Sequence, residues 1–156
     1  MSGPGAEAWA MLVGVSMSLR GRWLQAGLDE GLTPPQAMSL MSLSVDQPRR
    51  IGDLARYMHC DASYATALAD RLEERGFAER RTSATDRRVK ELVPTEEGIA
   101  AQARLRAAFT APPPGLEDLP AGDQEAMLRV ARALSEHIDP EMAARFGLAP
   151  REGRPG

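Results

Sequence analysis

The stretch that decides the fold is IGDLARYMHCDASYATALADRLEERG, residues 51–76. Its first part, 51–59, places apolar residues at helical spacing and so predicts a short helix. After a brief turn at His59 and Cys60, Asp61 is a good N-cap for a second helix, which Gly76 ends. Two short helices separated by a tight turn are typical of a helix-turn-helix.

The second of these helices separates an apolar stripe from a more polar face. The stripe consists of Ala62, Ala65, Leu68, Ala69 and Leu72. Off the stripe lie Ser63, Tyr64, Thr66, Ala67 and Arg71. Three of these carry hydroxyl groups that can bond bases or phosphates, and Arg71 can reach phosphate or guanine. The pattern predicts a helix that enters the major groove of DNA with its N-terminal polar groups facing base edges.

Two strand-like runs follow the second helix, at 77–81 and 88–93. The loop between them, 82–87, is small and polar, becomes basic at its end, and is too long for a two-residue turn. These features predict a β-hairpin.

Positive charge gathers on this hairpin, although the whole chain of 156 residues has a net charge of −3. Ten basic and seven acidic residues fall within 49–90, and within 80–90 five basic residues face Asp86 alone. Neutralising phosphates releases counterions, so a basic hairpin beside a helix-turn-helix favours binding to a polyanion. The loop is narrow enough to place Arg87 or Arg88 in the minor groove, where the negative potential attracts arginine.

Helices are also expected on both sides of this region. Residues 6–28 read as one long helix that is apolar on more than one face, and a last helix is expected over 121–137. A helix that is apolar nearly all round is normally covered on several sides, which predicts a second subunit. The residues expected to form the dimer are Trp9, Leu12, Val13, Val130, Leu134 and Ile138.

Five short strings, taken in order and spacing, resemble the MarR family of bacterial transcription regulators. They are IGDLA (51–55), DRLEERG (70–76), ERR (79–81), DRR (86–88) and TEEG (95–98). The resemblance covers 33–98 and implies a mainly α fold with a small β-hairpin wing. It further implies a homodimeric winged-helix repressor, whose terminal helices form the dimer and whose two lobes bind a pseudo-palindromic operator.

By this resemblance, the helix 62–74 is the recognition helix and 80–90 is the wing. Asp86 and Arg88 match the wing's Asp-x-Arg pattern, in which the arginine commonly enters the minor groove and the aspartate steadies the loop. Relatives often carry a base-contacting side chain where this chain has Ala67, so specificity is expected to rest more on the neighbouring hydroxyls and on DNA shape. The residues expected to contact DNA are Ser63, Tyr64, Thr66, Ala67, Arg71, Arg81, Asp86, Arg87 and Arg88.

The resemblance also implies a small effector, often an aromatic or phenolic acid or a drug-like hydrophobe, bound between the dimerisation helices and the lobe. Trp23, Met38 and Met41 are candidate lining residues, although ordinary core packing explains them more simply. The effector would act by favouring a spacing of the lobes that no longer matches successive major grooves. The expected organisation is a dimerisation helix in 1–32, a winged lobe in 33–98, dimerisation helices in 99–149 and a disordered tail in 150–156.

The remaining features argue against an enzyme and for the cytoplasm. There is one cysteine, no Cys/His cluster, no nucleophile elbow and no phosphate loop, so neither a metal nor a cofactor is expected. No apolar stretch is long enough for a membrane span, and the first residues lack a secretory n-region. Two alternatives stay open: a thiol-based redox regulator acting through Cys60, and a winged-helix protein-interaction module without DNA binding.

Overall fold

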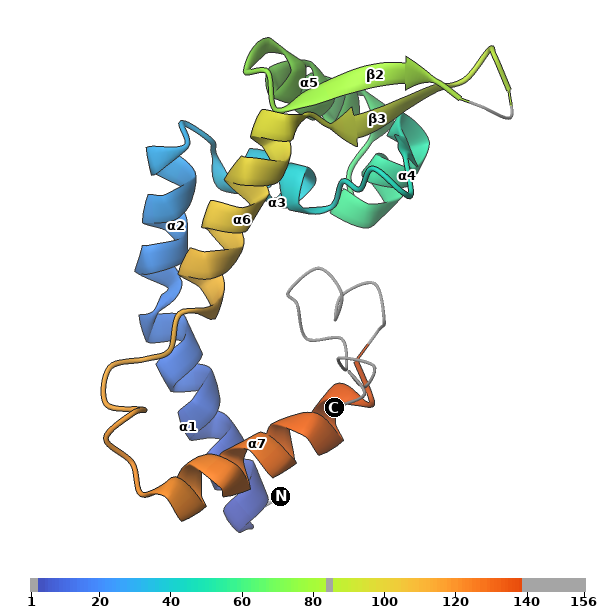
Figure 1. The fold of residues 1–156 in the computed structure, drawn as a ribbon. Helices are drawn as coiled ribbons and strands as arrows, with labels where there is room; N and C mark the ends of the chain where they lie inside the picture. The colour runs from blue at the N-terminus through green and yellow to red at the C-terminus, as the bar shows by residue number, and fades with distance from the viewer. Residues whose placement is uncertain (1–2, 84–85, 139–156) are drawn as a thin grey trace, which may run out of the picture. The chain divides into compact units, whose positions relative to one another are not determined.

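The computed structural model describes residues 3–83 and 86–138 (Figure 1). The helices in this part of the chain are α1 (Pro4–Ser18), α2 (Arg20–Asp29), α3 (Pro34–Met41), α4 (Ile51–Met58), α5 (Ala62–Glu74), α6 (Glu96–Thr110) and α7 (Ala121–Ser135). The strands are β1 (Arg49–Arg50), β2 (Ala78–Thr82) and β3 (Lys90–Pro94). The prediction of a mainly helical chain with a small hairpin is confirmed, while the tail predicted at 150–156 lies outside the described residues.

The chain divides into two compact units. The central unit is formed by residues 22–108, and the terminal unit takes in the described residues 3–21 and 109–138. The central unit contains the helix-turn-helix and the hairpin, and the terminal unit contains α1 and α7.

The helix-turn-helix consists of α4 and α5, as the sequence predicts. The turn between them depends on His59, which takes a left-handed conformation with φ of 51°. Asp61 then caps α5, because its carboxylate accepts a hydrogen bond from the backbone N–H of Tyr64 at 2.9 Å. Figure 1 shows α5 beside the β2–β3 hairpin, which extends beyond the helices as an arm.

The hairpin belongs to a three-stranded antiparallel sheet in the order β1-β3-β2. The two-residue β1 pairs with the other edge of β3, so that Arg49 lies opposite Leu92. Periodicity does not reveal so short a strand, and the sequence did not predict it. Both hairpin strands begin one or two residues later than predicted, because Phe77 is buried in the core before β2 begins and Val89 belongs to the turn, where its N–H donates to the carbonyl of Asp86 at 2.9 Å.

The core of the central unit is built mainly from leucines contributed by almost every element. Its fully buried leucines are Leu32, Leu40, Leu54, Leu72, Leu92 and Leu105. A buried amide lies among them: Nε2 of Gln102 donates to the carbonyl oxygens of Leu40 at 2.6 Å and Leu43 at 3.0 Å. Because the last carbonyls of a helix have no partner within the helix, Gln102 satisfies the end of α3 from within α6.

The start of α6 is fastened to the segment before β2. The Thr95 hydroxyl donates to the Gly76 carbonyl at 2.6 Å and accepts from the Gly98 N–H at 3.0 Å. The backbone comes so close here that a Cβ on Gly98 would lie 1.9 Å from the Phe77 carbonyl oxygen. Position 98 therefore requires glycine.

The prediction of one continuous helix over 6–28 is wrong at one point, because α1 ends at Ser18 and α2 begins at Arg20. At the break, the Ser18 hydroxyl donates to the Val15 carbonyl at 2.7 Å, and the Leu19 N–H is shared between the carbonyls of Val15 and Ser16. Such bonds tighten a helix end into a 3₁₀-like turn. No helix in the described part of the chain is long and apolar enough to cross a membrane.

Candidate nucleic-acid interface

The structure places the predicted DNA-contacting residues of α5 on its solvent-exposed face. Ser63, Tyr64, Thr66, Ala67 and Arg71 are all exposed. The stripe on the opposite side packs into the core through Ala65, Leu68, Ala69 and Leu72. Tyr64 keeps 46% of its surface exposed, so it is not a packing residue of the core. One face of α5 is therefore free for a partner.

The polar groups on this face differ in how far they are engaged. The Thr66 hydroxyl donates to the Ala62 carbonyl at 2.8 Å, one turn earlier in the same helix. Arg71 forms an ion pair with Glu74, with Nη1 and Oε2 2.7 Å apart. Of the groups predicted to read DNA from α5, the only cation is thus already paired.

Two arginines of the wing, unlike Arg71, are not engaged in ion pairs with other described residues. Arg87 and Arg88 are exposed, and neither guanidinium has an ion-pair partner among the described residues. Asp86 shapes the backbone beneath them, because its Oδ1 accepts a hydrogen bond from the Arg88 N–H at 2.9 Å. Arg81, which the sequence also assigned to DNA, is exposed and forms an ion pair with Glu79, with Nε and Oε1 2.7 Å apart. Among the described residues of the wing, Arg87 and Arg88 are the arginines without an ion-pair partner, and Lys90 donates to the Thr82 hydroxyl at 2.7 Å.

Arg80 has a role that the sequence did not reveal. It counts toward the basic hairpin, but its guanidinium lies between two carboxylates of α5: Nη2 is 2.8 Å from Oδ1 of Asp70, and Nη1 forms an ion pair with Glu73. Its backbone N–H also donates to Glu73 Oε1 at 2.9 Å. Asp70 and Glu73 stand three residues apart and so lie on one face of the helix. This spacing of two acidic residues was the sequence signal for a cation bound between them. Arg80 joins α5 to β2, the first strand of the wing.

The basic residues around β1 are engaged within the central unit as well. The guanidinium of Arg49 lies 4.8 Å from the centre of the Tyr57 ring, and Arg56 is paired with Asp53. Nε of Arg50 lies 3.7 Å from Glu91 Oε1 on β3. These pairs are mostly exposed, so they hold the local geometry with little energy.

A second ion cluster joins α6 to the end of α2. Arg104 binds both carboxylate oxygens of Glu30, at 2.6 and 2.8 Å, and also Glu97 at 2.8 Å. The hydrogen bond from Arg104 lowers the pKa of Glu30, and the two carboxylates raise the pKa of Arg104. Arg75 closes the cluster by donating to the Glu30 carbonyl at 2.7 Å. This arrangement of ion pairs stabilises the fold of the winged lobe by connecting α6 to the end of α2.

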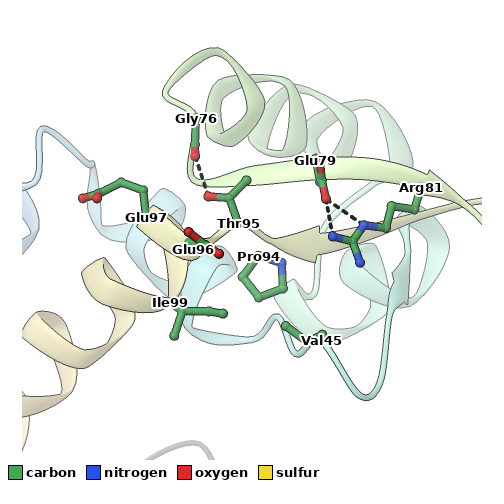
Figure 2. A pocket seen from close by; sticks show the side chains of 9 residues that line it. All are labelled: Val45, Gly76, Glu79, Arg81, Pro94, Thr95, Glu96, Glu97 and Ile99. Carbon is green, nitrogen blue, oxygen red and sulfur yellow. Dashed lines mark hydrogen bonds and ion pairs between the residues drawn. The ribbon is translucent and has the colours of Figure 1, made fainter.

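An open pocket of about 570 Å³ lies on the central unit, beside the start of α6 (Figure 2). It is lined by Val45, Gly76, Glu79, Arg81, Pro94, Thr95, Glu96, Glu97 and Ile99. The predicted effector residues lie elsewhere. Met41 is buried in the core, Trp23 packs against that core, and Met38 is partly exposed on α3. The structure does not bring these three into the pocket.

The residues predicted to form a dimer all lie in the terminal unit and are exposed. On α1 these are Trp9, Leu12 and Val13, with 61%, 43% and 41% of their surfaces exposed. On or just after α7 they are Val130, Leu134 and Ile138, between 38% and 55% exposed. No residue of either helix is buried.

The two residues of the helix-turn-helix turn offer no separate site. Cys60 is partly buried and packs against the core, and its N–H donates to the Ala55 carbonyl at 3.0 Å. His59 is exposed beside it. Over 3–83 and 86–138, no group of three or more His, Cys, Asp or Glu residues is placed to hold a metal ion.

Comparison with known proteins identifies the winged segment. Residues 32–90 match the model of the MarR family. HTH-type transcriptional repressor MdtR of Bacillus subtilis (strain 168) is 36% identical to this chain over 69 residues. The aligned region spans 44% of this chain and 44% of the length of MdtR.

Solved structures resemble a larger part of the chain. YusO from Bacillus subtilis superposes with a TM-score of 0.68 at 24% identity, over 85% of this chain and 95% of that one. RV1404 from Mycobacterium tuberculosis gives a TM-score of 0.70 at 20% identity, over 90% and 99%. The S. aureus MepR–DNA complex gives 0.65 at 20% identity, over 83% and 98%. These likenesses confirm the winged-helix fold, and the match to the MarR family model is confined to residues 32–90.

Proposed function

We propose that this protein is a sequence-specific, double-stranded DNA-binding transcription regulator. The observation that carries the proposal is the combination of an exposed, hydroxyl-bearing face on α5 with Arg87 and Arg88 of the wing, whose guanidinium groups have no ion-pair partner among the described residues. Such a lobe can present a helix to the major groove and a cation to the minor groove. MdtR is named a transcriptional repressor and MepR has been solved on DNA, which supports the same role here. The protein would act in the cytoplasm, as a regulator and not as an enzyme.

The proposed assembly is a homodimer. Apolar side chains line α1 and α7 without being buried, and a second copy would cover Trp9, Leu12, Val13, Val130, Leu134 and Ile138. A two-fold dimer presents two copies of α5 to half-sites about one helical turn apart, which requires a pseudo-palindromic operator. In this proposal residues 1–32 and 99–149 serve dimerisation and 33–98 form the DNA-binding lobe.

The regulator is proposed to act as a repressor that a small hydrophobic or aromatic ligand releases. The name of MdtR supports repression. Met38, partly exposed on α3, and Trp23, partly buried against the core, are the residues through which such a ligand would reach the lobe, while Met41 would respond only through repacking. By binding one lobe spacing better than another, the ligand would shift the dimer away from the form that fits DNA.

Fluorescence anisotropy tests the DNA-binding proposal. DNA from upstream of the gene and a scrambled control are each titrated at several salt concentrations. A dimer that makes about eight phosphate contacts should show a log–log salt slope of roughly −7, with the upstream site about 10³-fold tighter. Arg88→Ala should weaken binding and flatten the slope by about one for each protomer.

The matched control is Arg20→Ala, which removes one exposed positive charge from the start of α2, outside the lobe. This variant should bind both DNAs as the parent protein does. If the folded, dimeric protein binds neither DNA at low salt, the proposed function is wrong. Equal slopes with equal affinities would place the operator elsewhere, and selection from random DNA would then find it.

A further inference from the structure

The N-terminal half of α5 carries no charged side chain. From Ala62 to Ala69 its residues are alanine, serine, tyrosine, threonine and leucine, and the first charges along the helix are Asp70 and Arg71. In a helix-turn-helix, the N-terminal residues of the second helix are the ones that meet base edges. The surface available for reading bases is therefore made of hydroxyl and methyl groups together with the exposed ring of Tyr64.

Within that surface, two consecutive residues, Thr66 and Ala67, each offer a methyl group. The Thr66 hydroxyl donates its proton to the Ala62 carbonyl at 2.8 Å, so the γ-methyl and the oxygen lone pairs are what remain for a partner. Ala67 is exposed and offers its β-methyl. Ser63 lies three residues before Thr66 and four before Ala67, so these positions form one continuous strip on the helix.

Guanine readout from this helix is disfavoured by the charges farther along it. Arginine reads guanine through two hydrogen bonds to O6 and N7. Arg71, the only arginine within α5, is paired with Glu74 at 2.7 Å, and Asp70 is paired with Arg80 at 2.8 Å. Moving Arg71 onto a base would leave the Glu74 carboxylate unpaired beside the DNA, where phosphate repels it.

We propose that α5 recognises thymine, with the 5-methyl groups of thymines in each half-site packing against the methyl groups of Thr66 and Ala67. This inference rests on the proposed DNA-binding function and names the base class that the same site reads. Contact between an alanine or threonine methyl and the thymine methyl is a recognised form of major-groove readout. The unpaired Arg87 and Arg88 of the wing agree with it, because A·T-rich DNA has the narrow minor groove that attracts arginine.

The test begins with selection of a binding site by the full-length protein from random double-stranded DNA. Each thymine of the selected half-site is then replaced by deoxyuridine, which pairs identically and lacks only the 5-methyl group. Losing one buried methyl contact should weaken binding about fourfold, and about 16-fold when both half-sites are changed. Replacing guanines with 7-deazaguanine, which lacks the N7 acceptor, should leave affinity within about twofold.

Protein variants locate the contact. Ala67→Gly removes the β-methyl, and Thr66→Ser removes the γ-methyl while keeping the hydroxyl. In each variant, replacing the contacted thymine by deoxyuridine should no longer weaken binding, since the methyl group that contacts the thymine is already absent from the protein. Ala103→Gly places the same substitution at an exposed alanine of α6, and deoxyuridine should weaken the binding of this variant as much as it weakens that of the parent protein.

The outcomes separate this inference from the function on which it rests. Tight, selective binding that tolerates deoxyuridine everywhere and fails with 7-deazaguanine would overturn thymine recognition while leaving DNA binding intact. A selected half-site without thymine would also overturn it. If a folded, dimeric protein enriched no sequence, the proposed function would fail first, and thymine recognition with it.

Discussion

Glu73 of α5 and Arg80 of β2 are joined both by backbone and by side chain. Oε1 of Glu73 accepts the Arg80 backbone N–H at 2.9 Å, and Oε2 is ion-paired with the Arg80 guanidinium. Asp70, one turn earlier, binds the same guanidinium at 2.8 Å. Helix α5 and strand β2 are thereby held together, so the proposed major-groove and minor-groove contacts would be made by one rigid piece.

Replacing Arg80 with glutamine should loosen this connection. The backbone bond to Glu73 remains, but two charge-assisted bonds are lost, and their partly exposed setting limits the cost to about 1–2 kcal/mol of unfolding free energy. Urea denaturation measures the change. Arg81→Gln removes a more exposed pair with Glu79 and should cost less than about 0.5 kcal/mol, so equal losses for the two variants would contradict the role given to Arg80.

Gly98→Ala should be among the most destabilising single-methyl substitutions in the chain. The added Cβ would meet the Phe77 carbonyl oxygen at 1.9 Å, and backbone on both sides leaves no flexible side chain to yield. We expect a loss of about 2–4 kcal/mol in unfolding free energy, measured by thermal or urea denaturation.

The control for Gly98 is Gly52→Ala in α4, where an added Cβ meets nothing within 4 Å. Alanine is the better helix former, so this variant should gain up to about 1 kcal/mol. A Gly98→Ala protein as stable as the parent would show that the α6 start and the Phe77 segment are not in close contact.

Stability should fall on the acid side because of Glu30. Its pKa in the folded protein is lowered from the ordinary value of 4.5 by the bidentate bond from Arg104. A carboxylate with a lowered folded pKa contributes stability that is complete above its unfolded pKa and is lost as the pH falls through the folded value. Glu30→Gln should therefore lower stability at pH 7 and flatten the dependence below pH 4.5.

Urea midpoints measured between neutral and acid pH check this prediction. Glu136→Gln is the matched control, since that carboxylate is exposed just after α7 and takes part in no ion pair among the described residues. If both variants kept the acid dependence of the parent protein, the Glu30–Arg104 bond would not contribute to it.

The proposed dimer predicts a solution mass of twice 16.9 kDa. Charge placed on the exposed apolar stripe of α7, in the double variant Val130→Glu with Leu134→Glu, should raise the dimer dissociation constant by at least about 100-fold, because each carboxylate would be buried without a partner. Sedimentation equilibrium measures it. Val45→Glu changes an equally exposed apolar residue of the central unit and should leave the dimer unchanged. A monomeric parent protein would refute the assembly.

Local signals predicted the winged lobe well. The spacing of Leu54, Leu68 and Leu72, together with the cap at Asp61, gave both helices of the helix-turn-helix, since periodicity and capping depend on neighbours in the chain. A local contact of the same kind stands at the start of α3, where the Gln36 side chain accepts from the Thr33 N–H at 2.9 Å. The break at Leu19 and the strand β1 have no comparably strong local signal, and both were missed.

By itself, then, the sequence determined the order of helices, the hairpin and the face of α5 that is turned to solvent. Which basic side chains are available depended on the tertiary structure: the Arg80 guanidinium is bound by Asp70 and Glu73, whereas the Arg88 guanidinium has no ion-pair partner among the described residues. The tertiary structure also decided that Gln102 satisfies carbonyls about 60 positions away and that Gly98 lies against Phe77. The physical reason is that helix periodicity acts between residues three or four apart, whereas ion pairs, buried hydrogen bonds and close backbone contacts depend on segments brought together by folding.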